Sequence, residues 1–169
     1  MNETKWLIAR EIPRLRRYAL ALARDPVAAD DLVQDTLERA IRKRHLWSRS
    51  GSVRNWLYRI LYNVFLNQTD KRRRVQQEVE LDQASAPVEP SSAEQIVACR
   101  DIVAAMQLLP AEQRAAIALT AIEGLAYDEA AAVLGVPIGT LRSRLSRGRD
   151  RLRELCQVPK GRAYLRRVK

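Results

Sequence analysis

Apolar residues recur at intervals of three and four along most of this chain, the spacing that places them on one face of a helix. The signal is clear after Asp25 and Pro26, which form a typical helix start with the aspartate as N-cap. The same spacing predicts further helices over residues 5–23, from Val53 to about Arg73, from Ser92 to Leu109, from Pro110 to Gly124, over 127–134, and from the turn after Gly135 towards Pro159. Pro13 is expected to interrupt the first of these and to start a new turn. The helix that ends at Leu109 is expected to begin with a capping-box pattern at Ser91 and Ser92 and to face Ile102, Val103 and Met106 inward. Strand-type alternation is absent from the sequence, so we predict an all-α protein.

Residues 124–156 have the layout of a helix-turn-helix. A first helical run from Tyr127 to Leu134 stops at Gly135, and a second run carries four leucines on one stripe. The rest of the second run holds six arginines and short hydroxyl side chains, which suit guanine edges and phosphates in a major groove. A solvated basic surface helix is the alternative. The glycine at the turn, the apolar spacing before it and the arginines after it together favour a DNA-reading helix.

The net charge of +10 is unevenly distributed along the 169 residues. Residues 1–74 carry 17 Lys and Arg against 8 Asp and Glu, and residues 99–169 carry 13 against 7. Residues 75–98 hold no basic residue and 5 acidic ones. Because 75–92 also has two prolines and few large apolar side chains, we predict a flexible acidic linker there. Basic surfaces of this size indicate a polyanion partner, most simply nucleic acid.

Two small helical bundles joined by a linker follow from these patterns. The predicted units are an N-terminal module over 1–74, the linker over 75–92, a C-terminal module with the helix-turn-helix over 93–158, and a basic tail over 159–169.

Several classes of protein have little support in the sequence. No apolar run approaches the roughly 18 residues that a membrane-spanning helix needs, and the first residues have no signal-peptide pattern, so we expect no membrane insertion and a cytoplasmic location. His45 is the only histidine and has no nucleophile signature nearby, while Cys99 and Cys156 lack companion ligands. We therefore expect no catalytic residues, no metal and no cofactor.

Two helical faces in the N-terminal module are candidate contact surfaces. The helix after Asp25 gathers acidic residues outside its apolar stripe; the helix dipole alone explains this, but a protein partner with a basic groove is the alternative. The helix after Val53 interleaves aromatic, amide and arginine side chains, which suit unstacked bases. A core role for Trp56 and for one of the tyrosines is the competing interpretation.

Three sequence blocks in this order resemble the extracytoplasmic-function (ECF) sigma factors, the small two-domain class of bacterial RNA polymerase sigma subunits. The blocks are DDLVQDTLERA at 30–40, SVRNWLYRILYNVFLNQTDKRRR at 52–74, and LPAEQRAAIALTAIEGLAYDEAAAVLGVPIGTLRSRLSRGRDRL at 109–152. The resemblance covers residues 10–156. It implies a non-enzymatic subunit that binds core RNA polymerase through the clamp helices of the largest subunit and the flap, recognises promoter DNA, and is controlled by an anti-sigma factor.

The resemblance also assigns residues to three contact surfaces. Polymerase contacts are expected at Asp30, Asp31, Leu32, Gln34, Asp35 and Leu37. Contacts with the melted minus-ten element, including a loop that receives an extruded base, are expected at Trp47, Ser48, Arg49, Trp56, Tyr58, Arg59, Tyr62, Asn63, Asn67, Lys71, Arg72 and Arg73. Contacts with the minus-thirty-five element are expected at Arg114, Thr140, Arg142, Ser143, Arg144, Ser146, Arg147 and Arg149, of which Arg114, Arg144 and Arg149 are more suited to phosphates or to structural roles.

Three positions depart from the family pattern. Ala126 and Pro137 stand where serine caps are common, which is expected to loosen each helix start by about 1 kcal/mol, and Asn67 stands where aspartate is common. Two other functions compete with a sigma factor. A conventional helix-turn-helix regulator would have no use for the acidic face, and a sigma-like decoy that sequesters an anti-sigma factor would need neither the arginines nor the aromatic face.

Overall fold

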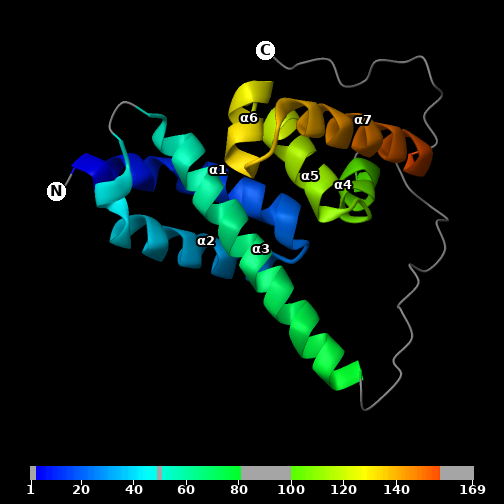
Figure 1. Ribbon diagram of the computed structural model, residues 1–169, viewed down its shortest axis with the longest axis horizontal. Coiled ribbons are helices and arrows are strands. Elements are labelled where there is room, and N and C mark those ends of the chain that lie inside the picture. The colour runs from blue at the N-terminus through cyan, green and yellow to red at the C-terminus, as the bar shows by residue number, and fades with distance from the viewer. Residues whose placement is uncertain (1–2, 49–50, 81–99, 157–169) are drawn as a thin grey trace.

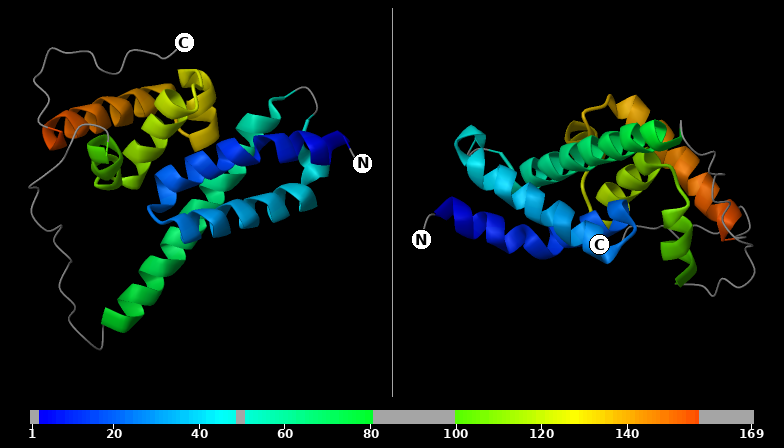
Figure 2. Two further views of the ribbon diagram at one scale, coloured as in Figure 1. Left: turned by 180° about the vertical axis from the view of Figure 1, so that it is seen from behind. Right: turned by 90° about the horizontal axis from the view of Figure 1, so that it is seen from below.

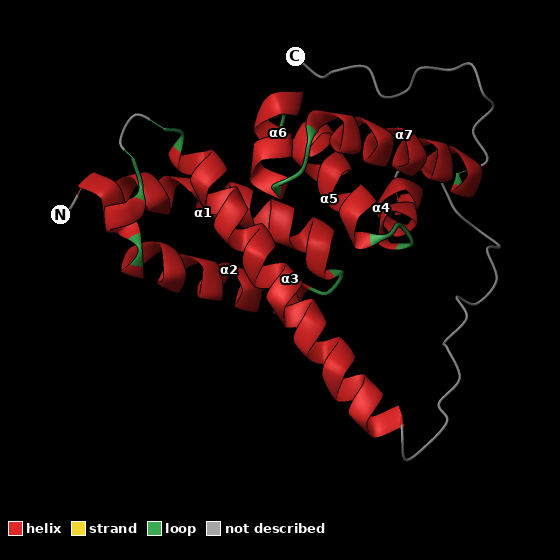
Figure 3. Cartoon of the chain, in the orientation of Figure 1, coloured by secondary structure: helices red, strands yellow, loops and turns green. Residues whose placement is uncertain are grey.

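The computed structural model describes residues 3–48, 51–80 and 100–156, and within these ranges it contains helices, turns and loops but no strand (Figure 3). This agrees with the predicted all-α class and with two helical modules. In the described residues no helix combines the length and the apolar character that a bilayer span requires.

The N-terminal module consists of α1 (Glu3–Ala23), α2 (Pro26–Arg42), the short 3₁₀ turn η1 (Arg44–Leu46) and α3 (Val53–Glu80). The start of α2 is as predicted, because a carboxylate oxygen of Asp25 accepts a hydrogen bond from the backbone N–H of Ala28 at 2.8 Å. Helix α1 runs through Pro13 without interruption and ends before Arg24, whose φ is 67°. The core of this module is formed by Leu15, Tyr18, Leu22, Leu32, Leu57 and Leu61, each at most 1% exposed.

The C-terminal module consists of α4 (Arg100–Gln107), α5 (Ala111–Ile117), the π turn η2 (Ala118–Ile122), α6 (Tyr127–Leu134) and α7 (Ile138–Leu155). Gly135 adopts φ 66° between α6 and α7, a left-handed conformation that closes α6 and that glycine adopts without strain. Helix α7 packs against α5, and Gly148 lies at the contact. Figure 1 shows α6 and α7 as a helix-turn-helix, as predicted.

Two predictions about individual segments are wrong. Helix α3 does not end near Arg73 but continues to Glu80, and its last part projects beyond the rest of the N-terminal module (Figure 1). Ile102 and Val103, expected to face inward, are 47% and 63% exposed, whereas Met106 is buried as expected. The predicted cap at Ser91 and Ser92, most of the linker, Cys99 and the basic tail lie outside the described residues.

The two modules are in contact with each other. Helix α3 packs beside α6, and α1 packs against α5 and η2, an arrangement that Figure 2 shows from behind and from below. Consequently one face of α1 and α3 is covered by the C-terminal module.

Candidate nucleic-acid and protein interfaces

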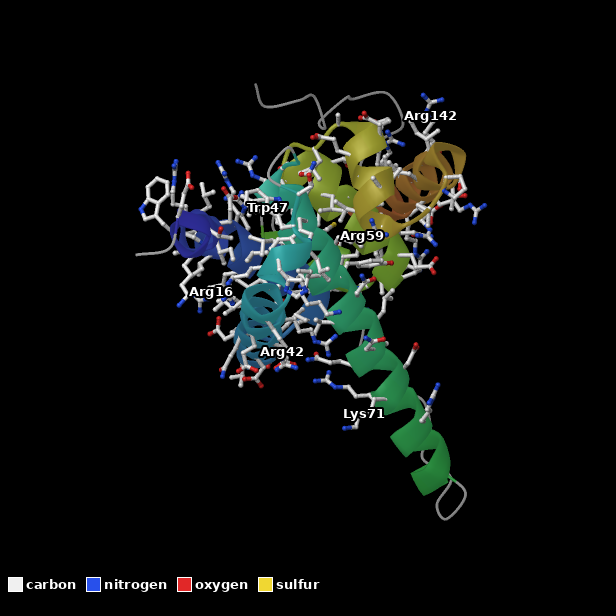
Figure 4. The ribbon with its side chains drawn as sticks, turned by 60° about the vertical axis from the view of Figure 1, so that its left-hand side comes forward. Arg16, Arg42, Trp47, Arg59, Lys71 and Arg142 are labelled. Atoms are coloured by element: carbon white, nitrogen blue, oxygen red, sulfur yellow. The ribbon has the colours of Figure 1, made fainter. Side chains whose placement is uncertain are left out.

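Helix α7 presents a polar face to solvent and an apolar face to its own module. Leu141, Leu145 and Leu152 are buried, while Arg142, Ser146 and Arg147 are exposed. Arg142 points away from the body of the protein in Figure 4. The exposed cations and hydroxyl group can therefore approach a DNA groove without any rearrangement of the helix.

A hollow of about 290 Å³ lies between the start of α6 and this face of α7. Its lining residues are Tyr127, Arg142, Leu145, Ser146, Arg149 and Arg153. The guanidinium of Arg149 donates to the hydroxyl of Tyr127 at 3.3 Å, which holds the arginine at the edge of the hollow. The predicted minus-thirty-five set did not include Tyr127, which belongs to α6, or Arg153, which lies about three turns after Arg142 on the same side of α7.

Other residues of the predicted minus-thirty-five set have internal partners. The guanidinium of Arg144 lies 3.1 Å from a Glu112 carboxylate oxygen, with 17% of the arginine side chain exposed. The hydroxyl of Ser143 donates to the carbonyl of Thr140 at 3.0 Å, within the same helix, and both residues are half-buried. These contacts leave Arg142, Ser146 and Arg147 as the accessible part of the set.

Arg114, which was expected to contact phosphates or to serve a structural role, is buried in this structure. It is 2% exposed, and its guanidinium donates to the carbonyl of Leu109 at 2.7 Å and to the carbonyl of Leu22 at 2.9 Å. Burial, assisted by the nearby charge of Arg24, lowers the pKa of Arg114 to about 10, so the group stays charged at neutral pH. The sequence alone does not show that backbone carbonyl groups of Leu109 and Leu22 will accept hydrogen bonds from Arg114.

The acidic face of α2 is largely accessible. Asp30, Asp31 and Gln34 are exposed, and Asp35 and Leu37 are half-buried. The guanidinium of Arg16 on α1 donates two hydrogen bonds to the carboxylate of Asp30, at 2.6 and 3.2 Å. These hydrogen bonds lower the pKa of the Asp30 carboxyl. The carboxylate of Asp35 accepts from Gln68 on α3 at 2.8 Å, so α3 helps to orient this face.

Leu32 was expected to contact a protein partner, and this prediction is wrong. The residue is 1% exposed and belongs to the core between α1, α2 and α3. The helical spacing of the apolar residues already places Leu32 on the buried side of α2. This spacing predicts its burial better than its position within the acidic block 30–40 predicts a surface contact.

The loop before α3 carries an aromatic pair. The rings of Trp47 and Trp56 lie 6.4 Å apart between centroids, and the indole N–H of Trp47 donates to the carbonyl of Gly51 at 3.2 Å. Both tryptophans are half-buried, and Figure 4 shows Trp47 beside the start of α3. Ser48 at the edge of the same loop is exposed, whereas Arg49 lies outside the described residues.

Along α3, the polar members of the predicted minus-ten set reach solvent. Arg59, Asn63 and Asn67 are exposed, and so are Lys71 and Arg72 further along the helix. Figure 4 labels Arg59 and Lys71, with Lys71 nearer the projecting end of the helix. The side chain of Arg73 is not among those that the structure describes. These exposed amide and cationic side chains could hydrogen-bond to base edges or contact the phosphates of a nucleic acid.

Tyr58 and Tyr62 are buried, contrary to their predicted contact with a melted strand. They are 0% and 3% exposed, and the ring of Tyr58 packs edge-on against Tyr18 with centroids 5.3 Å apart. The hydroxyl of Tyr58 donates to Glu123 of the C-terminal module at 2.5 Å. Burial, followed by this hydrogen bond, raises the pKa of Tyr58 far above its usual range, and burial also raises the pKa of Tyr62.

Glu123 is the functional candidate that sequence reasoning missed. Its side chain is completely buried, and the guanidinium of Arg17 donates to its two carboxylate oxygens at 2.6 and 2.8 Å. In the sequence it is one acidic residue near a helix end, and its partners are 65 and 106 positions away. Among the described residues, no group of three or more His, Cys, Asp or Glu could hold a metal ion.

Comparisons with known proteins agree with this geometry. The chain matches the sigma2 domain of PhyR over residues 8–62 and region 4 of sigma-70 over residues 99–152. It is 39% identical over 153 residues to the ECF RNA polymerase sigma factor SigE of Mycolicibacterium smegmatis, covering 88% of this chain but only 59% of SigE. It is 33% identical to the ECF RNA polymerase sigma factor EcfG of Rhodopseudomonas palustris, covering 87% of this chain and 81% of EcfG.

Similarity to a solved structure also extends over both modules. The sigma factor RpoE of Bartonella quintana, crystallised with the anti-sigma factor NepR, superposes with a TM-score of 0.79 at 34% identity. The superposition covers 95% of this chain and 100% of the RpoE chain.

Proposed function

Because this chain belongs to the ECF family of RNA polymerase sigma factors, we propose that it directs core RNA polymerase to promoters with two separated elements and holds the melted strand while the polymerase catalyses. Sigma factors are not enzymes, and the residues described above serve recognition. Since its proposed partner is core polymerase, we propose that the chain acts in the cytoplasm.

The observation that carries this proposal is the exposed acidic face of α2. Asp30 and Asp31 lie on a module separate from the DNA-reading face of α7, and a conventional helix-turn-helix regulator would not need them. Carboxylates at this density favour a partner with basic residues over DNA, whose phosphates would repel them. We assign this face to the clamp helices of core polymerase.

The two remaining surfaces, on α7 and α3, are proposed to contact the two promoter elements. Arg142, Ser146 and Arg147 of α7 are proposed to read base edges of the minus-thirty-five element, since each is exposed on the outer side of the helix. Arg59, Asn63 and Asn67 of α3 are proposed to contact the melted minus-ten strand. The Trp47–Trp56 pair supplies ring surface next to the loop in which an extruded base would lie.

An anti-sigma factor is the third partner that we propose. The similarity to RpoE of Bartonella quintana, a protein crystallised with NepR, extends over both modules and supports a comparable inhibitor for this chain. Exposed Ile102 and Val103 on α4 are available to a protein partner of the C-terminal module.

Run-off transcription with purified bacterial core polymerase tests the proposal. The full chain is expected to confer start-site selection on promoter templates, and Asp31→Arg is expected to abolish both transcripts and co-purification with the core enzyme. Glu154→Arg is the matched control, because it reverses another exposed carboxylate, at the far end of α7. Selective binding of duplex operators by the isolated chain, with no start-site selection on core polymerase, would refute a sigma function.

A further inference from the structure

The acidic face of α2 orients two of its carboxylates in different ways. Both oxygens of the Asp30 carboxylate accept hydrogen bonds from Arg16, whose guanidinium carries a full positive charge. Asp35 accepts instead from the side-chain amide of Gln68 on α3, at 2.8 Å, and an amide carries no net charge. The charge of Asp30 is therefore already matched by the protein itself, whereas the charge of Asp35 is left for another molecule.

The hydrogen bond from Gln68 uses only one oxygen of Asp35. The amide nitrogen Nε2 donates to Oδ2, and Oδ1 has no hydrogen bond or ion pair within the described part of the chain. Asp35 is half-buried, so part of its surface remains open to solvent. Each carboxylate oxygen can accept hydrogen bonds on its own. A cation from outside can thus bind Oδ1 while Gln68 stays bonded to Oδ2.

Helix α3 is firmly packed at the point that carries Gln68. Val64 and Phe65, about one turn earlier, are 0% and 9% exposed, and α3 packs against α2. Gln68 is itself half-buried. A side chain that is already ordered before a partner arrives reduces the conformational entropy that binding must remove. Gln68 therefore presents the carboxylate of Asp35 in a fixed orientation.

We propose that Gln68 is a positioning residue for the polymerase contact, because it orients the Asp35 carboxylate without cancelling its charge. This inference rests on the proposed function, which assigns the acidic face of α2 to core polymerase. The group that Oδ1 would receive from the partner is a guanidinium or an ammonium, since a carboxylate oxygen makes its strongest hydrogen bonds with charged donors. Gln68 acts through Asp35 and does not itself touch the partner.

Gln68→Ala in the full chain tests this role. Fluorescence anisotropy of the labelled protein measures its affinity for purified core polymerase, without DNA, so that the neighbouring strand-binding residues of α3 do not contribute. The affinity is expected to fall about three- to tenfold, the cost of ordering one free side chain on binding. Thr69→Ala is the matched control, because Thr69 is also half-buried but donates to the carbonyl of Phe65 within α3.

A double-mutant cycle shows whether Gln68 acts through Asp35. Asp35→Ala alone is expected to weaken core binding about thirtyfold or more, because it leaves a cation of the partner unpaired. Adding Gln68→Ala to Asp35→Ala is expected to cause no further loss, since the group to be oriented is already gone. An equal loss from Gln68→Ala in both backgrounds would overturn the positioning role.

A swapped pair separates the position of the charge from the hydrogen bond. Asp35→Asn combined with Gln68→Glu keeps the shapes of both side chains and reverses the direction of the hydrogen bond, but it moves the negative charge from α2 to α3. The thermal unfolding midpoint is expected to stay near that of the unmodified chain, while core affinity falls as far as in Asp35→Asn alone. Full core affinity in the swapped pair would show that the partner does not need the charge at position 35, and would overturn the proposal.

The same binding measurements distinguish this inference from the proposed function. If the unmodified chain does not bind core polymerase, the proposed function fails and the role of Gln68 fails with it. If the unmodified chain binds and Gln68→Ala binds equally well, only the positioning role is refuted. A loss in Gln68→Ala that is absent in Thr69→Ala and disappears in the Asp35→Ala background supports both.

Discussion

The crossing of α5 and α7 predicts opposite effects for the same substitution at two glycines of α7. A Cβ atom built on Gly148 would lie 2.7 Å from Cδ1 of Ile117 and 3.2 Å from Cβ of Gln113, whereas one built on Gly139 meets nothing within 4 Å. Ile117 is 4% exposed and has little room to move away. Alanine at position 148 therefore forces a shift in the packing of α7 against α5.

The magnitude follows from two opposing terms. Replacing a helical glycine by alanine stabilises a helix by about 0.5–1 kcal/mol, and this gain applies to both positions. Overpacking a close contact costs about 1–3 kcal/mol and applies only to Gly148. We expect Gly139→Ala to raise the free energy of unfolding slightly and Gly148→Ala to lower it by about 1 kcal/mol.

Urea unfolding of the two variants measures this difference. Ile117→Val removes the Cδ1 atom, and by itself is expected to cost about 0.5–1.5 kcal/mol. In the Gly148→Ala background that cost should shrink or change sign, because the new methyl group occupies the vacated space; a double-mutant cycle gives the coupling energy. Equal stabilisation by Gly139→Ala and Gly148→Ala, with no coupling to Ile117, would refute the packing argument.

Two further predictions concern the proposed DNA-reading face of α7 and the start of α2. Arg147→Ala is expected to weaken discrimination between correct and altered minus-thirty-five elements by about 1–3 kcal/mol in holoenzyme footprinting. Arg151→Ala is the control and should leave this discrimination unchanged, because the guanidinium of Arg151 lies 3.1 Å from Glu154. Equal discrimination by the two variants would show that Arg147 does not contribute to recognition. Asp25→Ala is expected to destabilise the chain by about 1 kcal/mol in thermal unfolding through loss of the cap to Ala28, and an unaltered midpoint would show that the cap contributes nothing.

Features encoded within a few residues could be predicted from the sequence. The N-cap at Asp25, the turn at Gly135 and the leucine stripe of α7 each depend on neighbours three or four positions away. The continuous α1 differs from the expected interruption at Pro13 because packing of the surrounding apolar face outweighs one lost backbone hydrogen bond.

Contacts between the modules could not be predicted in the same way. Periodicity shows that Tyr58 and Tyr62 lie on particular faces of a helix, but the burial of those faces depends on a module that begins some forty residues later. The same reason explains Arg114 and Glu123, whose partners across the contact are Leu22, Arg17 and Tyr58. For Ile102 and Val103, apolar character alone did not show which residues of α4 face the core.

The π turn over Ala118–Ile122 makes the chain tolerant of a change in its own length at one point. A π turn holds one residue more than the α-helical turn that it replaces, so a single deletion between Ala118 and Ile122 is absorbed when the turn closes to an α turn. The same deletion within the regular helix α7 has no surplus residue to remove, and it would rotate the rest of that helix by about 100°. The direction of the helix-turn-helix relative to the rest of the molecule is therefore expected to survive the loss of one codon in the π turn.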